Sequence, residues 1–121
     1  MSALCLAGGG EVIRVATLAF TLAWTHTIER TAWEEDWRVD PAALVLVAAR
    51  VKGTGAGMEP PDSARFDGTW WRWSPGVSVP SVTLRRAPQA GDWRLCVAGA
   101  CRPVGEILPP AADPVTLSAC P

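Results

Sequence analysis

Apolar and polar side chains alternate with a period of two along several segments of this 121-residue chain. In Phe20–Ile28 every second residue is large (Phe, Leu, Trp, His and Ile), and the residues between them are Thr and Ala. The segment Trp33–Val39 repeats the pattern, with Trp, Glu, Trp and Val on one side and Glu, Asp and Arg on the other. Successive side chains of a strand point to opposite faces, so this period predicts β-strands. A turn over Glu29–Ala32 would join the two segments in a hairpin. Two helical turns over Trp33–Arg38 are the alternative.

Gly and Pro, eleven of each, separate these strands from others. Further strands are expected at Leu4–Ala7, Glu11–Ala16, Leu44–Val51, Trp70–Trp73, Val82–Arg86, Trp93–Val97 and Ala100–Val104. The apolar run Leu44–Val51 predicts a strand covered on both faces. Together they predict an all-β fold, a single small antiparallel β-sandwich or partly open barrel of about seven to nine short strands. Residues 1–108 would form this domain, and residues 109–121, rich in Pro and Ala, a loosely attached tail.

Composition and charge exclude several functions. Hydrophobic residues make up 49% and charged residues 19%, which suits a globular domain. A net charge of −1 provides no basic surface for nucleic acid. The uncharged run between Arg14 and Glu29 is shorter than the ~20 residues of a spanning helix, so no direct membrane insertion is expected. The sequence shows no targeting segment, so we expect either that the domain stays in the cytoplasm or that the given sequence lacks its leader.

Two of the four cysteines form the sharpest local pattern. If Ala98–Gly99 is a two-residue hairpin turn, Cys96 faces Cys101 across the ladder. Opposed residues at a non-hydrogen-bonded position lie about 4.5 Å apart between Cα atoms, within reach of a disulfide. A hairpin disulfide or two reduced thiols is favoured over a redox or metal pair. Cys5 and Cys120 are also able to pair with each other, and the sequence does not decide this.

Candidate chemistry is sparse. His26 is the only histidine, and no G-x-S-x-G nucleophile motif accompanies it, so we expect no catalytic residue and no enzyme. The acidic run Glu34–Asp36 has residue types that do acid–base work or bind calcium, but is interpreted as a solvated face. The loop Gly53–Gly57 lacks the spacing of a phosphate-binding motif. His26, Met58 and the cysteines are soft ligands without metal-site spacing, so no metal or cofactor is expected.

Three motifs, in this order, resemble a bacterial family. Residues 24–29 read Trp-Thr-His-Thr-Ile-Glu, residues 33–35 read Trp-Glu-Glu, and residues 55–60 read Gly-Ala-Gly-Met-Glu-Pro. Across roughly Leu4 to Val104 the chain resembles the family called domain of unknown function 1850, with Thr27 in place of the usual Ser. The hairpin from Trp93 to Cys101 resembles the proteobacterial branch of that family.

The resemblance implies a context rather than a reaction. Members are often encoded beside, or fused to, the membrane subunit of tripartite ATP-independent periplasmic (TRAP) transporters of the TAXI type. Many carry an N-terminal anchor that exposes the domain in the periplasm or otherwise outside the cytoplasm. We therefore expect a non-enzymatic accessory or interaction domain whose partner is a TRAP transporter membrane subunit.

The expected contact site joins the charged turn after residue 25 to the glycine loop. Its residues are His26, Glu29, Trp33, Glu35, Gly55, Gly57, Met58 and Glu59. The alternative function is a small-ligand or metal-binding β module of the periplasmic type. In that case Trp70, Trp71 or Trp73 would supply a stacking surface, because aromatic faces bind sugars and cations.

Overall fold

The structure is a computed structural model that describes residues 2–25, 31–52, 60–86 and 91–121. Within these residues the chain forms twelve strands and one short 3-10 turn, η2 (Val104–Glu106). The strands are β1 (Ala3–Gly8), β2 (Glu11–Val15), β3 (Ala19–Thr25), β4 (Ala32–Asp40), β5 (Ala43–Lys52), β6 (Arg65–Phe66), β7 (Trp70–Trp73), β8 (Val77–Val79), β9 (Ser81–Leu84), β10 (Arg94–Val97), β11 (Ala100–Pro103) and β12 (Val115–Cys120).

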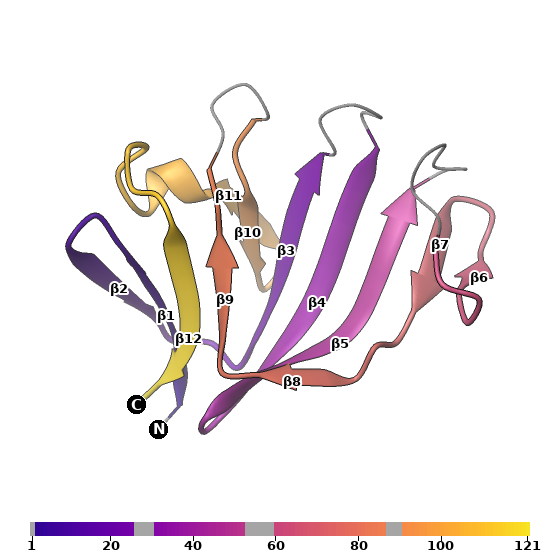
Figure 1. Ribbon diagram of the computed structural model, residues 1–121, viewed down its shortest axis with the longest axis horizontal. Helices are drawn as coiled ribbons and strands as arrows, with labels where there is room; N and C mark the ends of the chain where they lie inside the picture. The colour runs from indigo at the N-terminus through magenta and orange to yellow at the C-terminus, as the bar shows by residue number, and fades with distance from the viewer. Residues whose placement is uncertain (1, 26–30, 53–59, 87–90) are drawn as a thin grey trace.

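These strands form two antiparallel sheets that face each other (Figure 1). The small sheet has four strands in the order β2-β1-β12-β9. The large sheet has eight, in the order β11-β10-β3-β4-β5-β7-β6, with β8 also paired to β5. The all-β prediction is therefore confirmed, and in the described residues the arrangement is an open sandwich rather than a closed barrel. In Figure 1, β7 and β6 lie on the side of the large sheet that is farthest from the small one.

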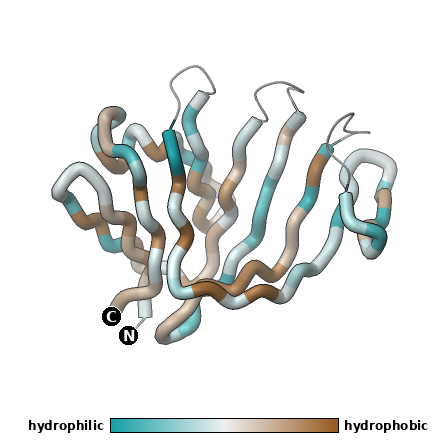
Figure 2. The backbone as a smooth tube through the Cα atoms, in the orientation of Figure 1, coloured by the Kyte–Doolittle hydropathy of each residue, from teal (hydrophilic) through white to brown (hydrophobic). Residues whose placement is uncertain are grey.

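The alternation of side chains fills the space between the sheets. Figure 2 shows hydrophobic and hydrophilic residues alternating along the strands. Leu4 and Leu6 of β1 and Leu117 of β12 are fully buried in the same cluster as Leu22 of β3 and Leu95 of β10. Burying one such side chain contributes roughly 1.5–3 kcal/mol, so this leucine layer is the main source of stability between the sheets.

The nine expected strands are all present, and the helical alternative at Trp33–Arg38 is not adopted, because these residues lie in β4. Three further strands, β6, β8 and β12, are not predicted by the sequence analysis. The expected loose tail is wrong for β12, which pairs with β1 on one side and β9 on the other. The Pro and Ala content of residues 109–121 hides the alternation of buried Val115 and Leu117 with the less buried Thr116 and Ser118.

A β-bulge shapes the centre of the large sheet. Asp36 faces Ala48 and Trp37 faces Leu46, so Val47 has no opposite residue in β4. Val47 is 43% exposed, and the expected cover on both faces of Leu44–Val51 is incomplete at this residue. On either side of the bulge β5 has a different neighbour, β7 or β8. From β8 the chain continues into β9, so this corner links the two sheets.

Both possible disulfides are formed. Cys96 bonds to Cys101 across the β10–β11 hairpin, in the register expected from the sequence. Ala98 and Gly99 both have positive φ, 51° and 82°, as a tight two-residue turn of this kind requires. The second bond joins Cys5 of β1 to Cys120 of β12, residues 115 positions apart, and settles the pairing that the sequence leaves open. All four cysteines are therefore bonded.

Removing the two disulfides should have unequal effects on stability. The entropy that a disulfide removes from the unfolded chain grows with the length of the loop it closes. We expect Cys5→Ala/Cys120→Ala to lower the free energy of unfolding by about 5 kcal/mol and Cys96→Ala/Cys101→Ala by about 2 kcal/mol. Urea denaturation of both double variants without reductant measures the difference. Equal losses would contradict the dependence on loop length.

Candidate functional site

The expected contact site maps to one end of the large sheet. Thr25, the last residue of β3, pairs with Ala32 of β4. The next residue of β4, Trp33, pairs with Val51 near the end of β5. The described residues that border the segments 26–30 and 53–59 are therefore neighbours in the sheet.

Two of the eight expected site residues can be located. Trp33 and Glu35 are two positions apart in β4, so their side chains share the face that looks towards the small sheet. The other six lie outside the described residues: His26, Glu29, Gly55, Gly57, Met58 and Glu59.

Four tryptophans gather at this end of the large sheet, and we call Trp24, Trp33, Trp73 and Trp93 the tryptophan cluster. The rings of Trp24 and Trp33 stack with centroids 5.9 Å apart. Trp93 lies 4.9 Å from Trp24, and Trp73 meets Trp33 edge-on at 5.9 Å. Aromatic pairs at these separations contribute stability beyond the area they bury. The cluster therefore forms a rigid, half-buried aromatic surface beside Glu35.

Glu35 lies in an apolar environment. Its cross-strand neighbours are Leu22 and Ala49, both buried. Burial raises the pKa of Glu35 above its ordinary value of 4.5, and a hydrogen bond donated by Trp37 Nε1 at 3.3 Å offsets part of this effect. Among the described residues, this long hydrogen bond is the only one to the carboxylate. Within the described residues, Glu35 therefore retains capacity to accept a proton or a further hydrogen bond.

The indole N–H of Trp33 is also unsatisfied. Its Nε1 atom is buried and has no hydrogen-bond acceptor among the described residues. A buried donor without a partner costs about 1–3 kcal/mol, and buried tryptophans usually find one. Because the Nε1 atom is covered, an acceptor from a partner would reach it and recover this cost only after neighbouring side chains had moved.

The opposite face of the same strands carries an ion-pair network. The Arg50 guanidinium donates to Glu34 Oε1 at 2.7 Å and to Asp36 Oδ2 at 2.8 Å. The Thr21 hydroxyl donates to Asp36 Oδ1 at 2.7 Å. Burial alone would raise the pKa of Asp36, but the hydrogen bonds from Arg50 and Thr21 outweigh it and lower the pKa below 3.8. The acidic run Glu34–Asp36 is thus divided between two faces, and its interpretation as one solvated face is incomplete.

The tryptophans of β7 do not share a face either. Trp70 lies beneath two cations, with Arg50 Cζ 5.8 Å and Lys52 Nζ 6.0 Å from its ring centroid. Trp71 points to the other face, where it packs against Phe66 of β6 at 5.1 Å. The stacking surface expected from residues 70–73 is therefore split between two faces of the sheet.

Sequence reasoning missed Trp93 as a site residue and missed the pair of side chains that fixes it. The Arg86 guanidinium, almost fully buried, donates to Asp92 at 3.1 Å and to the carbonyl oxygen of Pro109 at 2.8 Å. Asp92 in turn accepts from the backbone N–H groups of Trp93 at 2.9 Å and Gly105 at 2.6 Å. This pair of side chains, the Arg86–Asp92 clamp, holds Trp93 against Trp24. No local sequence motif indicates it.

Two features are absent from the described part of the chain. No helix there has the length and hydrophobicity that crossing a membrane requires. No group of three His, Cys, Asp or Glu side chains there is arranged to hold a metal ion.

The fold and the site define an open two-sheet β domain with an aromatic and acidic surface at one end of its larger sheet. The chain belongs to the family described as domain of unknown function (DUF1850), whose model matches residues 20–104. This confirms the resemblance over a narrower range than the expected Leu4–Val104. The matched range contains the tryptophan cluster and Glu35, whereas β1, β2 and β12 of the small sheet lie outside it. No curated protein and no solved structure matched the chain.

The neighbouring acids Glu35 and Asp36 should affect stability in opposite directions. The pKa of Glu35 is raised on folding, so its contribution is present at low pH and is lost as pH rises through the folded pKa. The pKa of Asp36 is lowered, so its contribution is present above 3.8 and is lost as pH falls.

We therefore expect Glu35→Gln to raise the free energy of unfolding at pH 7, with a smaller gain at pH 4, where Glu35 itself is increasingly protonated. Asp36→Asn should lower it by about 1–2 kcal/mol at pH 7, because it weakens a partly exposed, charge-assisted hydrogen-bond network. Urea denaturation at both pH values compares the two variants. A loss of stability at pH 7 in both would contradict the unsatisfied state of Glu35.

Proposed function

We propose that this chain is a non-enzymatic interaction domain that serves a TRAP-type solute transporter and contacts its partner through the tryptophan cluster and Glu35. One observation carries the proposal. The half-buried carboxylate of Glu35, whose pKa is raised, lies two positions along β4 from Trp33. The buried indole N–H of Trp33 has no acceptor among the described residues. Unsatisfied groups of opposite hydrogen-bonding character, set in an aromatic surface, suit recognition.

The chemistry of this surface indicates what it binds. Indole faces attract cations, and a carboxylate in apolar surroundings pairs strongly with a guanidinium or ammonium group. A Lys or Arg side chain of the partner would neutralise Glu35, and a neighbouring carbonyl oxygen would accept from Trp33 once the side chains that cover its Nε1 atom had moved. Tryptophan and arginine are enriched among the residues that dominate the binding energy of protein interfaces.

Family membership and the disulfides support the transporter context. Proteins of the DUF1850 family are often encoded beside or fused to a TRAP membrane subunit, which makes that subunit the proposed partner. Two disulfides favour an oxidising compartment such as the periplasm. The contact residues expected in segments 26–30 and 53–59 remain predictions, because they lie outside the described residues.

Binding to the membrane subunit of a TRAP transporter of the TAXI type tests the proposal. We expect Glu35→Gln and Trp33→Phe each to weaken binding about tenfold or more, because each removes one recognition group and keeps most of the side-chain volume. Matched controls are Glu34→Gln and Trp70→Phe, the same residue types on the opposite face of the sheet. Affinity is measured by biolayer interferometry on the detergent-solubilised subunit.

Two outcomes would refute the proposal. If the native domain does not bind the subunit, the transporter assignment is wrong. If the control variants lose binding while Glu35→Gln and Trp33→Phe bind as the native domain does, the contact surface lies on the other face. A thermal unfolding curve for each variant separates loss of contact from loss of fold.

A further inference from the structure

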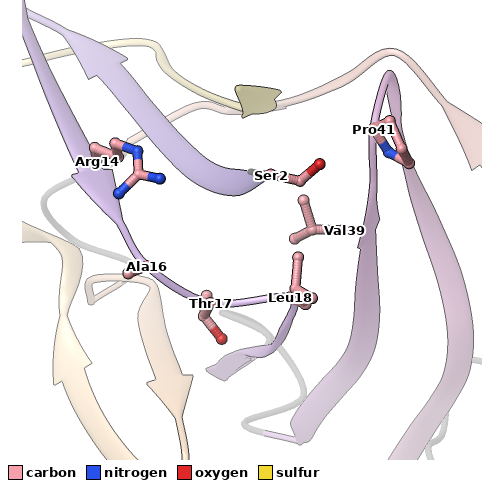
Figure 3. Close-up of a pocket in the computed structure, with 7 residues that line it drawn as sticks. All are labelled: Ser2, Arg14, Ala16, Thr17, Leu18, Val39 and Pro41. Carbon is pink, nitrogen blue, oxygen red and sulfur yellow. The ribbon is translucent and has the colours of Figure 1, made fainter. Parts of the chain in front are cut away.

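A cavity of about 500 Å³ opens at the end of β3 and β4 opposite the tryptophan cluster (Figure 3). It lies between the start of β1, the link from β2 to β3 and the hairpin that follows β4. Its volume is in the range of small-molecule sites, which is roughly 300–1,000 Å³. In Figure 3, Arg14 and Pro41 lie on opposite sides of it, with Ser2, Leu18 and Val39 between them.

Hydrogen bonds fix the wall of this cavity. The Thr17 N–H donates to the carbonyl oxygen of Val15 at 2.8 Å, and the Thr17 hydroxyl donates to that of Ala19 at 2.6 Å. The Val39 N–H donates to the carbonyl oxygen of Leu18 at 2.9 Å, which attaches the link to β4. The cavity is thus preformed, as small-molecule sites usually are.

The lining combines an aliphatic wall with hydrogen-bond donors. Leu18, Val39 and Pro41 form the apolar part, and the Leu18 side chain is 57% exposed, so it is accessible to a ligand. No Asp or Glu among the described residues lines the cavity.

The available donors are Arg14 and Ser2, and Figure 3 shows Arg14 at one side of the cavity with Ser2 nearer its middle. Arg14 donates through Nε to the carbonyl oxygen of Pro121 at 2.8 Å, and its two Nη groups have no acceptor among the described residues. The Ser2 hydroxyl makes no hydrogen bond there either. A guanidinium edge and a hydroxyl group together suit a carboxylate, since both are donors and one is charged.

We propose that this cavity binds a short aliphatic carboxylic acid. Its carboxylate accepts hydrogen bonds from the Nη groups of Arg14 and the hydroxyl of Ser2, and its alkyl chain covers Leu18, Val39 and Pro41. The site is separate from the tryptophan cluster, so a test of this site does not depend on the transporter contact.

Titration of the full chain with octanoate tests this site, by calorimetry and by amide chemical shifts. We expect saturable binding, with the largest shifts around Arg14, Leu18 and Val39. Octylammonium and methyl octanoate, which keep the chain but lack the anionic group, should bind at least about tenfold more weakly.

Variants separate the site from non-specific association. Arg14→Gln should weaken octanoate binding about tenfold or more, and Arg14→Lys should lose less, because it keeps the charge but not the planar pair of donors. Arg65→Gln removes another exposed arginine, in β6, and should bind octanoate as the native chain does. Near-ultraviolet circular dichroism confirms that each variant is folded.

The proposal fails on any of three results. These are no binding at millimolar octanoate, equal binding of octanoate and octylammonium, or equal affinities of the folded Arg14→Gln and Arg65→Gln variants.

Discussion

Contact between the inner faces of the two sheets is the interaction on which the rest of the structure depends. The leucines of β1 and β12 face those of β3 and β10, and neither sheet can bury its apolar side without the other. Because β1 and β12 are separated by more than a hundred residues, the small sheet requires pairing across almost the whole chain. The Cys5–Cys120 bond secures that pairing. Because the small sheet is fixed in this way, the large sheet that packs on it is also held, and its end carries the tryptophan cluster.

Strand β4 shows how one backbone serves two chemical purposes. Adjacent carboxylates in this strand point to opposite faces, and their environments shift their pKa values in opposite directions. Asp36 is held by Arg50 and Thr21 and ties three strands together. Glu35 has no such cation among its described neighbours. Adjacent positions of a single strand thus carry Asp36, which stabilises the sheet, and Glu35, through which the proposed contact is made.

Local patterns predict much of this fold, and long-range register decides the remainder. The facing positions of Cys96 and Cys101 follow from a two-residue turn, which a short sequence window contains in full. The strand at 115–120 is obscured by the Pro and Ala around it, and its place between β1 and β9 depends on partners far away in the chain. The sequence places Trp33 and Glu35 on one face, but the approach of Trp93 to Trp24 needs the Arg86–Asp92 clamp. Such a clamp joins segments that carry no local signal of their contact.

The pairing of Ala3 with Cys120 brings the two ends of the described chain to one point, as Figure 1 shows. The two ends of this domain therefore lie on adjacent paired strands. The domain could be spliced into a surface turn of a host protein without stretching either polypeptide, because the gap is no wider than that between adjacent strands. The Cys5–Cys120 disulfide would keep the two ends of the inserted domain together even if the residues at the junctions lost their structure.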